Sequence, residues 1–426
     1  MTDTQLPKLK KGWLGFLGPG LISGAADDDP SGIATYSQAG AQFGYGMLWT
    51  VVFTWPFMVA IQLICARIGR VTGAGIAANV NAVFPRPIVL GLVGLLVVAN
   101  TINIAADLAA MGEALQLVVG GGQHGHALVF GLACMTMQIF IPYRRYAPIL
   151  KWLTLVLFAY VATVLTVQVN WADAFRQTVW PALSMSSDYL LMVVAVFGTT
   201  ISPYLFFWQA SQEVEEMHAG HKRRPLRDMR RGGEPEIRRI ELDTTLGMAF
   251  SNIIAFFIML TTAATLYAHG IKDIQTSAQA AEALRPLAGN FTFLVFGLGI
   301  IGTGLLAVPV LAGSAAYAVA ETFGWRATLE AKPQQAKGFY SIIAAATLAG
   351  VLIDFTPIDP IKMLIWSAVI NGIVAVPIMA VMMIVATSPN TMGRFPLSPL
   401  LRAIGWAATA LMAAVVIALG WSIIKY

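Results

Sequence analysis

The chain has 426 residues, of which 57% are hydrophobic and only 12% are charged. Soluble domains carry about 25% charged residues, so this composition argues against a soluble protein and predicts one that crosses a membrane several times. The net charge is only +5, which gives no reason to expect a nucleic-acid partner. Cys65 and Cys134 both lie in apolar runs, and we expect buried thiols rather than a disulfide.

Apolar segments of about 20 residues predict membrane-spanning helices. Eleven such segments follow one another, at 13–43, 47–68, 88–118, 127–142, 146–169, 189–217, 242–269, 291–323, 338–353, 360–387 and 400–424. The first is expected to be retained, because no small-residue cleavage site follows the lysines that precede it. The predicted fold class is therefore an all-α polytopic membrane protein with about 11 transmembrane helices.

The basic residues are distributed unevenly between the loops. With a cytoplasmic N-terminus, 22 of the 27 Lys and Arg residues lie in cytoplasmic segments and 5 lie outside. This asymmetry follows the positive-inside bias and predicts a protein of the cell (inner) membrane with an external C-terminus. The longest polar stretch, 213–243, is interpreted as a solvated cytoplasmic linker, and its basic part, 217–243, is expected to contact anionic lipid.

Three consecutive aspartates, Asp27, Asp28 and Asp29, lie in the middle of the first span and are followed by Pro30. A carboxylate at this depth costs about 2.5–3.5 kcal/mol, and unpaired backbone cannot face hydrocarbon. We therefore predict that the helix breaks at Asp29-Pro30 and that the break forms a cation site facing protein or water. The alternative is that Asp-Pro ends a helix in a surface loop, but an apolar helical pattern resumes at Ile33.

A second break is predicted in the span 189–217. Pro203 lies in mid-span after the small polar residues Thr199, Thr200 and Ser202, and it follows Pro30 by 173 residues. Paired interruptions at equivalent positions of two halves are typical of transporters built from repeats, with the site at the midplane. Five helices per repeat would invert the second copy. The chain 1–426 then forms one transporter domain, with repeats at about 13–170 and 189–387 and a peripheral helix at about 400–424.

The residue types at these breaks favour a hard divalent cation. Carboxylate and carbonyl oxygens suit Mg²⁺, Ca²⁺ and Mn²⁺. The aspartates would repel an anion, including the carboxylate of an amino-acid substrate.

Three stretches resemble the start of the NRAMP divalent-metal transporters, namely 18–20 (Gly-Pro-Gly), 29–32 (Asp-Pro-Ser-Gly) and 38–45 (Gln-Ala-Gly-Ala-Gln-Phe-Gly-Tyr). The stretch 103–113 and the second break extend the resemblance. The family has the motif Asp-Pro-Gly-Asn in its first helix, and the resemblance implies a LeuT-type fold with an inverted five-helix repeat and discontinuous helices 1 and 6.

Departures from the family pattern are concentrated at the expected site. Gly32 stands where the family has Asn, and Ser202-Pro203-Tyr204 stands where it has Met-Pro-His. Ala110 replaces one of the family's two proton-relay carboxylates, and Asn100 stands where the family has an acidic residue. The combination is similar to the NRAMP-related magnesium transporters of prokaryotes. Smaller side chains leave room for the water shell that Mg²⁺ keeps when it is bound.

The resemblance assigns candidate roles residue by residue. Asp29 is the expected ligand, direct or through water, and Ala26 and Thr199 are expected to supply carbonyl oxygens. Gly32 and Ser202 would line the enlarged site, and Tyr204 would hydrogen-bond a bound water. The remaining candidates are less specific: Asp28 as a second carboxylate, Asn371 as a residue that reaches the site, and Asp27 and Asp107 along the ion pathway. Their alternatives are a cation-attracting vestibule for the two aspartates before Asp29, helix packing for Asp107 and an interhelical bond for Asn371.

We therefore expect a transporter that takes up partly hydrated Mg²⁺ and Mn²⁺ as a uniporter without proton coupling, works as a monomer and needs no cofactor. The alternatives are a proton-coupled Mn²⁺/Fe²⁺ importer, a non-transporting metal sensor and an amino-acid permease; an enzyme is the least consistent with the sequence. Two groups of side chains could form a regulatory metal site. The first is Glu215, Glu216, His218 and His221, and the second is His124 with His126. For both groups the simpler interpretation is that the side chains are solvated.

Overall fold

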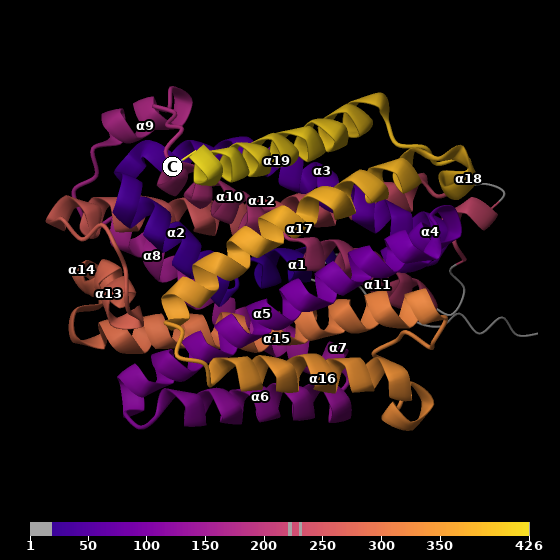
Figure 1. Ribbon diagram of the computed structural model, residues 1–426, viewed down its shortest axis with the longest axis horizontal. Helices are drawn as coiled ribbons and strands as arrows, with labels where there is room; N and C mark the ends of the chain where they lie inside the picture. Colours follow the sequence, from indigo (N-terminus) through magenta and orange to yellow (C-terminus); the bar gives the residue numbers. More distant parts are fainter. Residues whose placement is uncertain (1–18, 220–223, 230–231, 426) are drawn as a thin grey trace, which may run out of the picture.

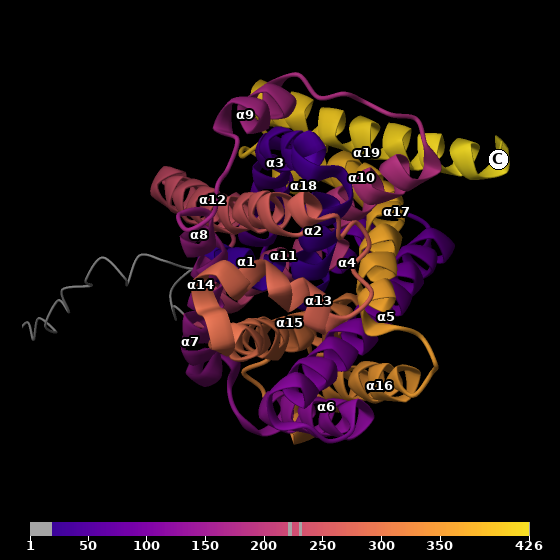
Figure 2. The same cartoon turned by 90° about the vertical axis from the view of Figure 1, so that its left-hand side faces the viewer.

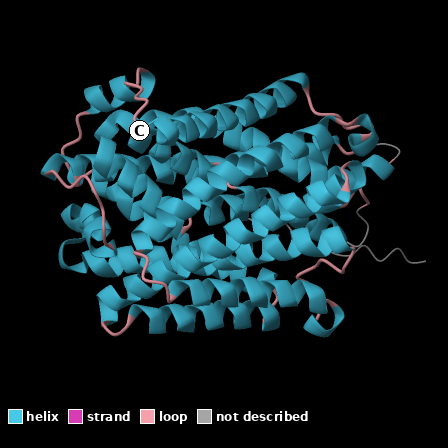
Figure 3. Ribbon diagram, viewed as in Figure 1, coloured by secondary structure: helices cyan, strands magenta, loops and turns pink. Residues whose placement is uncertain are grey.

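The computed structural model describes residues 19–219, 224–229 and 232–425, and every regular element within these ranges is helical (Figure 3). The α-helices of the first half are α1 (Pro19–Asp27), α2 (Pro30–Phe43), α3 (Leu48–Thr72), α4 (Ile76–Val83), α5 (Arg86–Val119), α6 (Gln123–Phe140), α7 (Tyr143–Leu153), α8 (Phe158–Val164) and α9 (Trp171–Val179). Those of the second half are α10 (Ser187–Thr200), α11 (Pro203–Ala219), α12 (Glu234–Thr265), α13 (Ser277–Ala281), α14 (Arg285–Ala288), α15 (Thr292–Phe323), α16 (Lys337–Asp354), α17 (Pro360–Thr387), α18 (Pro389–Met392) and α19 (Pro399–Lys425).

All eleven predicted spans correspond to helical segments, although the first six residues of the first span, 13–18, lie outside the described residues. By length and apolar composition alone, eight helical stretches in the described ranges could cross a membrane. The difference from eleven has three causes. The second half of the first span is joined with the second span in one stretch, Pro30–Thr72, the fifth span is divided into short pieces, and α6 carries several polar side chains.

Both predicted breaks are present. The first lies between α1 and α2, where Asp29 has extended backbone angles (φ −72°, ψ 171°) and its side chain caps α2. Pro30 follows as the first residue of α2, where its missing N–H leaves no hydrogen bond unmade. The second lies between α10 and α11, and Pro203 again begins the second half-helix. Asp and Pro therefore end one half-helix and start the next, as their chemistry predicts.

The polar linker predicted at 213–243 is shorter in the structure. Residues 213–217 belong to α11, as the predicted span 189–217 implies, but α11 continues to Ala219 and α12 begins at Glu234, eight residues before the predicted start. Gly233 has φ 118°, a conformation that glycine adopts readily, and it makes the turn that leads into α12. Acidic side chains in the first turn of α12 stabilise the start of this helix. Five short helices in the described ranges, α4, α9, α13, α14 and α18, were not predicted, and α8 ends five residues before the predicted end of the fifth span.

The helices form two groups around the breaks. In one group α5 packs on α6, α15 and α16, and α6 lies beside α16 at one edge of the molecule (Figures 1 and 2). In the other group α12 packs on α1, α2 and α3, and α10 packs on α17. α19 lies at the opposite edge, beside α3, α10 and α17. Three of the four halves of the broken helices, α1, α2 and α10, therefore belong to the second group, and the fourth, α11, packs on α3 and α15 and so joins the two groups.

Glycines allow the closest helix crossing near the first break. A Cβ atom on Gly24 would overlap the backbone of Gly247 in α12, and one on Gly247 would overlap the backbone of Gly20. Small residues let helix backbones approach closely in membranes. This contact fixes α1 against α12 and so positions the aspartates at the end of α1.

Candidate metal-ion site

Asp29 lies at the centre of the first break and is 2% exposed. Its Oδ1 accepts a hydrogen bond from the backbone N–H of Gly32 at 2.7 Å, as the cap of α2. Its Oδ2 accepts one from the side-chain amide of Asn103 at 3.0 Å and one from the hydroxyl of Tyr204 at 3.3 Å. The carboxylate is therefore oriented by three different helices, α2, α5 and α11.

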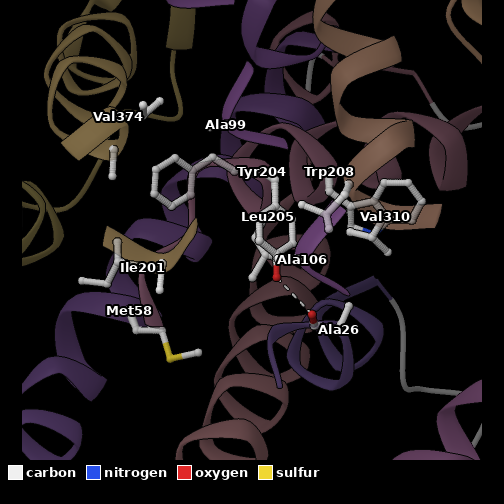
Figure 4. Close-up of a cluster of buried hydrophobic side chains, with 14 of the residues drawn as sticks. Ala26, Met58, Ala99, Ala106, Ile201, Tyr204, Leu205, Trp208, Val310 and Val374 are labelled. Carbon is white, nitrogen blue, oxygen red and sulfur yellow. Dashed lines mark hydrogen bonds between the residues drawn. The ribbon is translucent and has the colours of Figure 1, made fainter. Parts of the chain in front are cut away.

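Tyr204 joins the two breaks. It is the second residue of α11, and its hydroxyl donates to the carbonyl of Ala26 in α1 at 3.1 Å as well as reaching Asp29 (Figure 4). The sequence interpretation expected this hydroxyl to hydrogen-bond a bound water. In the structure it contacts the two oxygens that were expected to face the ion.

The two breaks also meet through small residues. A Cβ atom on Gly32 would lie 3.1 Å from the Thr199 hydroxyl and 3.4 Å from the Asp27 carbonyl oxygen, so little room remains there for a larger side chain. The hydroxyl of Ser202 donates to the carbonyl of Thr199 at 2.7 Å, so this expected ion-facing carbonyl is hydrogen-bonded within its own helix end.

Asp27 and Asp28 face a different helix from Asp29. The Ser251 hydroxyl in α12 lies 2.6 Å from Oδ2 of Asp27 and 3.1 Å from Oδ1 of Asp28. Both aspartates are at most 1% exposed, so neither borders open space in this conformation. Within the described residues, Oδ1 of Asp27 and Oδ2 of Asp28 have no hydrogen-bond partner.

Asp107 and Asn371 lie on the neighbouring helices α5 and α17. Asp107 is fully buried one turn after Asn103, and neither of its carboxylate oxygens has a hydrogen-bond partner among the described residues. Asn371 is 1% exposed and lies one turn after Ser367, whose hydroxyl is 3.1 Å from that of Ser31 in α2. The structure thus brings α17 to the first break, while among the residues that the structure describes no hydrogen bond joins Asn371 to the candidate site.

Two partners of the aspartates received no role in the sequence interpretation. Asn103 holds Asp29, and Ser251 lies between Asp27 and Asp28. The sequence does indicate a role for Asn103, because an amide in the middle of a span, four residues before Asp107, is costly unless it has a hydrogen-bond partner. The sequence does not indicate one for Ser251, because a single serine in a long apolar helix commonly hydrogen-bonds its own backbone.

The regulatory metal site considered around Glu215 is wrong in its arrangement. Glu215 is 7% exposed and accepts hydrogen bonds from Tyr317, Thr328 and the backbone of Leu329, while Glu216 pairs with Arg239; His221 lies outside the described residues. At the other place, His124 pairs with Asp354 at 2.9 Å. In the described parts of the chain no group of three or more His, Cys, Asp or Glu side chains is arranged to hold a metal ion. An ion at Asp29 would therefore take most of its ligands from carbonyl oxygens, amides, hydroxyls or water.

Comparison with known families agrees with this arrangement of broken helices. Residues 20–422 match the model of the Nramp family, described as natural resistance-associated macrophage protein-like. The chain belongs to the Nramp family. Among its relatives is the divalent metal cation transporter MntH of Klebsiella pneumoniae subsp. pneumoniae, which is 26% identical over 418 residues, covering 96% of this chain and 94% of that protein.

Solved structures of low sequence identity share the fold of this Nramp chain. The manganese transporter of Eremococcus coleocola superposes with a TM-score of 0.74 at 15% identity, covering 98% of this chain and 89% of that one. Mhp1, a nucleobase-cation-symport-1 family transporter in a closed conformation, superposes with a TM-score of 0.59 at 13% identity, covering 96% of this chain and 93% of that one. The expected LeuT-type architecture and the expected family are both confirmed.

Proposed function

We propose that this Nramp protein takes up divalent metal ions, Mg²⁺ and Mn²⁺, as partly hydrated ions and without proton coupling. The observation that carries the proposal is the position of Asp29, a buried carboxylate at the point where two broken helices meet. The relatives named as divalent metal cation and manganese transporters support the substrate class.

The chemistry around Asp29 supports a hard ion. Its hydrogen-bond donors are a backbone N–H, the Asn103 amide and the Tyr204 hydroxyl, and none of these groups carries sulfur or imidazole. Ser202 and Tyr204 occupy the positions at which the sequence comparison placed the family's Met and His. Oxygen ligands such as the Asp29 carboxylate and the Ala26 carbonyl favour Mg²⁺ and Mn²⁺, whereas sulfur ligands would favour softer metals.

Partial hydration follows from the small number of fixed protein ligands. We propose Asp29 and the carbonyl of Ala26 as the principal ligands, with Gly32, Thr199 and Ser202 lining the site. Asp28 and Asn371 are proposed as outer ligands, and Asp27 and Asp107 as residues of the pathway. Mg²⁺ dehydrates reluctantly and usually keeps several waters, which would complete its coordination here.

The membrane potential is a sufficient driving force in this proposal. We propose that the chain works as a monomer in the cell (inner) membrane, with its N-terminus in the cytoplasm and its C-terminus outside. Each positive charge that enters a cell gains about 2.3 kcal/mol per 100 mV of inside-negative potential. A divalent ion gains twice that, and no coupled proton is required.

Ion flux into proteoliposomes that enclose a pH reporter tests the proposal. Saturable Mn²⁺ entry, competition by Mg²⁺ and an unchanged internal pH are the expected results. Proton entry that follows Mn²⁺ entry would identify a proton-coupled importer instead, with Asp107 as the first residue to test. Failure of Mg²⁺ to compete would contradict the proposed ion preference.

A further inference from the structure

A cavity of about 210 Å³ lies at the end of α11 that is remote from the helix break. It is formed by the start of α7, the last turns of α11 and the segment that follows α15. Its lining residues are Pro142, Tyr143, Gln212, Glu215, Leu329 and Glu330. None of these residues belongs to the site at Asp29.

The cavity is acidic, and one of its carboxylates is held in place. Glu215 accepts hydrogen bonds from the Tyr317 hydroxyl at 2.8 Å, the Thr328 hydroxyl at 2.9 Å and the Leu329 N–H at 2.9 Å. None of these three donors carries a charge, so they orient the carboxylate without neutralising it. Glu330 is exposed, and its charge is close enough to act on Glu215.

Two polar groups in the wall of the cavity need a partner. Tyr143 is 6% exposed, and its hydroxyl has no hydrogen-bond partner in the described ranges. The side-chain nitrogen of Gln212 is in the same situation. Buried polar groups are ordinarily satisfied. Both atoms are closed off from solvent in this conformation, so a small turn of either side chain would bring it to the water shell of a ligand in the cavity.

One face of α11 connects this cavity with the candidate ion site. Residues 204, 208, 212 and 215 fall within one quarter of the helix circumference at 100° per residue, and the first and last are about 16 Å apart along the axis. Tyr204 at one end contacts Asp29, and Glu215 at the other lines the cavity.

Between these ends stands an aromatic layer. The Trp208 ring packs edge-on against Tyr143 at 5.0 Å and against Tyr317 at 6.1 Å, so Trp208 separates the ion site from the cavity (Figure 4 shows Tyr204 and Trp208 on successive turns of α11). Trp208 is fully buried, and its indole nitrogen has no hydrogen-bond partner in the described part of the chain.

The cavity has room for a hydrated ion. Its volume of about 210 Å³ is several times the roughly 30 Å³ that one water molecule occupies in the liquid, so an ion with part of its water shell fits. Carboxylates, a hydroxyl and an amide are suitable outer partners for such waters, whereas an apolar ligand would leave them unsatisfied.

We propose that this cavity is a second cation site, in which Glu215 and Glu330 hold a hydrated divalent ion through its water shell, next to Trp208 on the path from Asp29. The inference rests on the proposed function, because that function makes Asp29 the site from which the ion is released. With the N-terminus in the cytoplasm, the cavity lies on the cytoplasmic side and receives the ion before it leaves the protein.

Mn²⁺ binding to the purified full-length chain tests the inference, with bound ions counted by the loss of the six-line signal of free Mn²⁺ in electron paramagnetic resonance. The wild-type chain is expected to bind two ions, and Asp29→Ala is expected to keep the one in the cavity. In the Asp29→Ala background, Glu330→Gln and Glu215→Gln should each lower the affinity for that remaining ion on the order of tenfold, because each removes a negative charge. Glu330 is exposed, so its variant is not expected to disturb folding.

Matched variants separate the cavity from other groups nearby. Tyr143→Phe should lower the affinity for the remaining ion. Tyr146→Phe removes a neighbouring hydroxyl that does not line the cavity, and it should leave this affinity unchanged. Glu321→Gln changes a partly buried carboxylate that accepts from Ala78 and Ser211 outside the cavity, and it should have no effect.

The outcomes distinguish the two proposals. Loss of all Mn²⁺ binding in Asp29→Ala would overturn the second site and leave the proposed function intact. Unchanged binding in Glu330→Gln and Glu215→Gln would also overturn it. Two ions retained in Asp29→Ala would instead contradict the role of Asp29, and with it the proposed function.

Discussion

Replacement of Tyr204 by Phe is expected to tighten Mn²⁺ binding. In the structure the Tyr204 hydroxyl donates to the Ala26 carbonyl and approaches Asp29, the two groups proposed as principal ligands. An incoming ion must displace this hydroxyl. Removing the hydroxyl raises the free energy of the ion-free state relative to the ion-bound state.

The geometry sets the size of this effect. A hydroxyl has one proton, so it donates to only one of its two acceptors at a time. The distances of 3.1 Å and 3.3 Å are longer than the usual 2.7–2.8 Å for such bonds. We therefore use the lower part of the range for a hydrogen bond, about 0.5–1 kcal/mol, which corresponds to binding that is about two- to fivefold tighter.

The assay is a Mn²⁺ titration of the purified chain monitored by calorimetry, with Tyr189→Phe as the control. The Tyr189 hydroxyl accepts a hydrogen bond from the Trp49 indole at 3.0 Å and lies outside both the candidate site and the cavity. The control should bind Mn²⁺ like the wild type. Weaker binding in Tyr204→Phe would refute the reasoning and show that the hydroxyl contributes to the water shell of the bound ion. Equal affinities in all three chains would show that it does not face the ion.

Three further predictions concern the site and its supports. Gly32→Asn should reduce competition by Mg²⁺ several-fold relative to Mn²⁺ uptake, because a Cβ at this position already approaches the second break. Gly198→Val should lower the free energy of unfolding by about 1–3 kcal/mol or more, because its side chain would overlap the backbone of α17, whereas Gly91→Val meets nothing within 4 Å. Arg239→Leu should cost about 3–5 kcal/mol, because it leaves the fully buried Glu213 without its partner at 2.8 Å.

The inhibition constant of Mg²⁺ against Mn²⁺ uptake tests the Gly32→Asn prediction. Thermal unfolding in detergent tests the predictions for Gly198→Val and Arg239→Leu. An unchanged Mg²⁺ constant would mean that no hydrated ion occupies the space beside Gly32. Equal melting of the two valine variants would contradict the close crossing of α10 and α17. Full stability in Arg239→Leu would mean that the Glu213 pair contributes nothing.

The breaks were predictable because their cause is local. Asp29-Pro30 and Ser202-Pro203 interrupt helices through their own backbone chemistry, and the cost of charge in a bilayer indicates where such a break must face. The partners were less predictable because they are distant in sequence. Asn103 lies 74 positions from Asp29, and Ser251 lies 223 from Asp28. Periodicity places such residues on a helix face but does not say which helix lies opposite.

The polar stretch 213–243 shows a different limit. Its charges predict exposure to solvent, yet Arg239 pairs with Glu213, Glu216 and Glu236 and so allows both α11 and α12 to extend into it. Composition alone cannot distinguish charges that face water from charges that neutralise one another. The expected contact with anionic lipid in this region would therefore depend on its basic residues other than Arg239.

Mn²⁺ uptake by Asp29→Ala proteoliposomes tests the central claim most directly. The surface variant Asp228→Ala serves as the control, because Asp228 is exposed and lies outside the helix breaks. The account predicts that Asp29→Ala takes up Mn²⁺ no faster than empty liposomes while Asp228→Ala matches the wild type. Uptake by Asp29→Ala at the wild-type rate would contradict it.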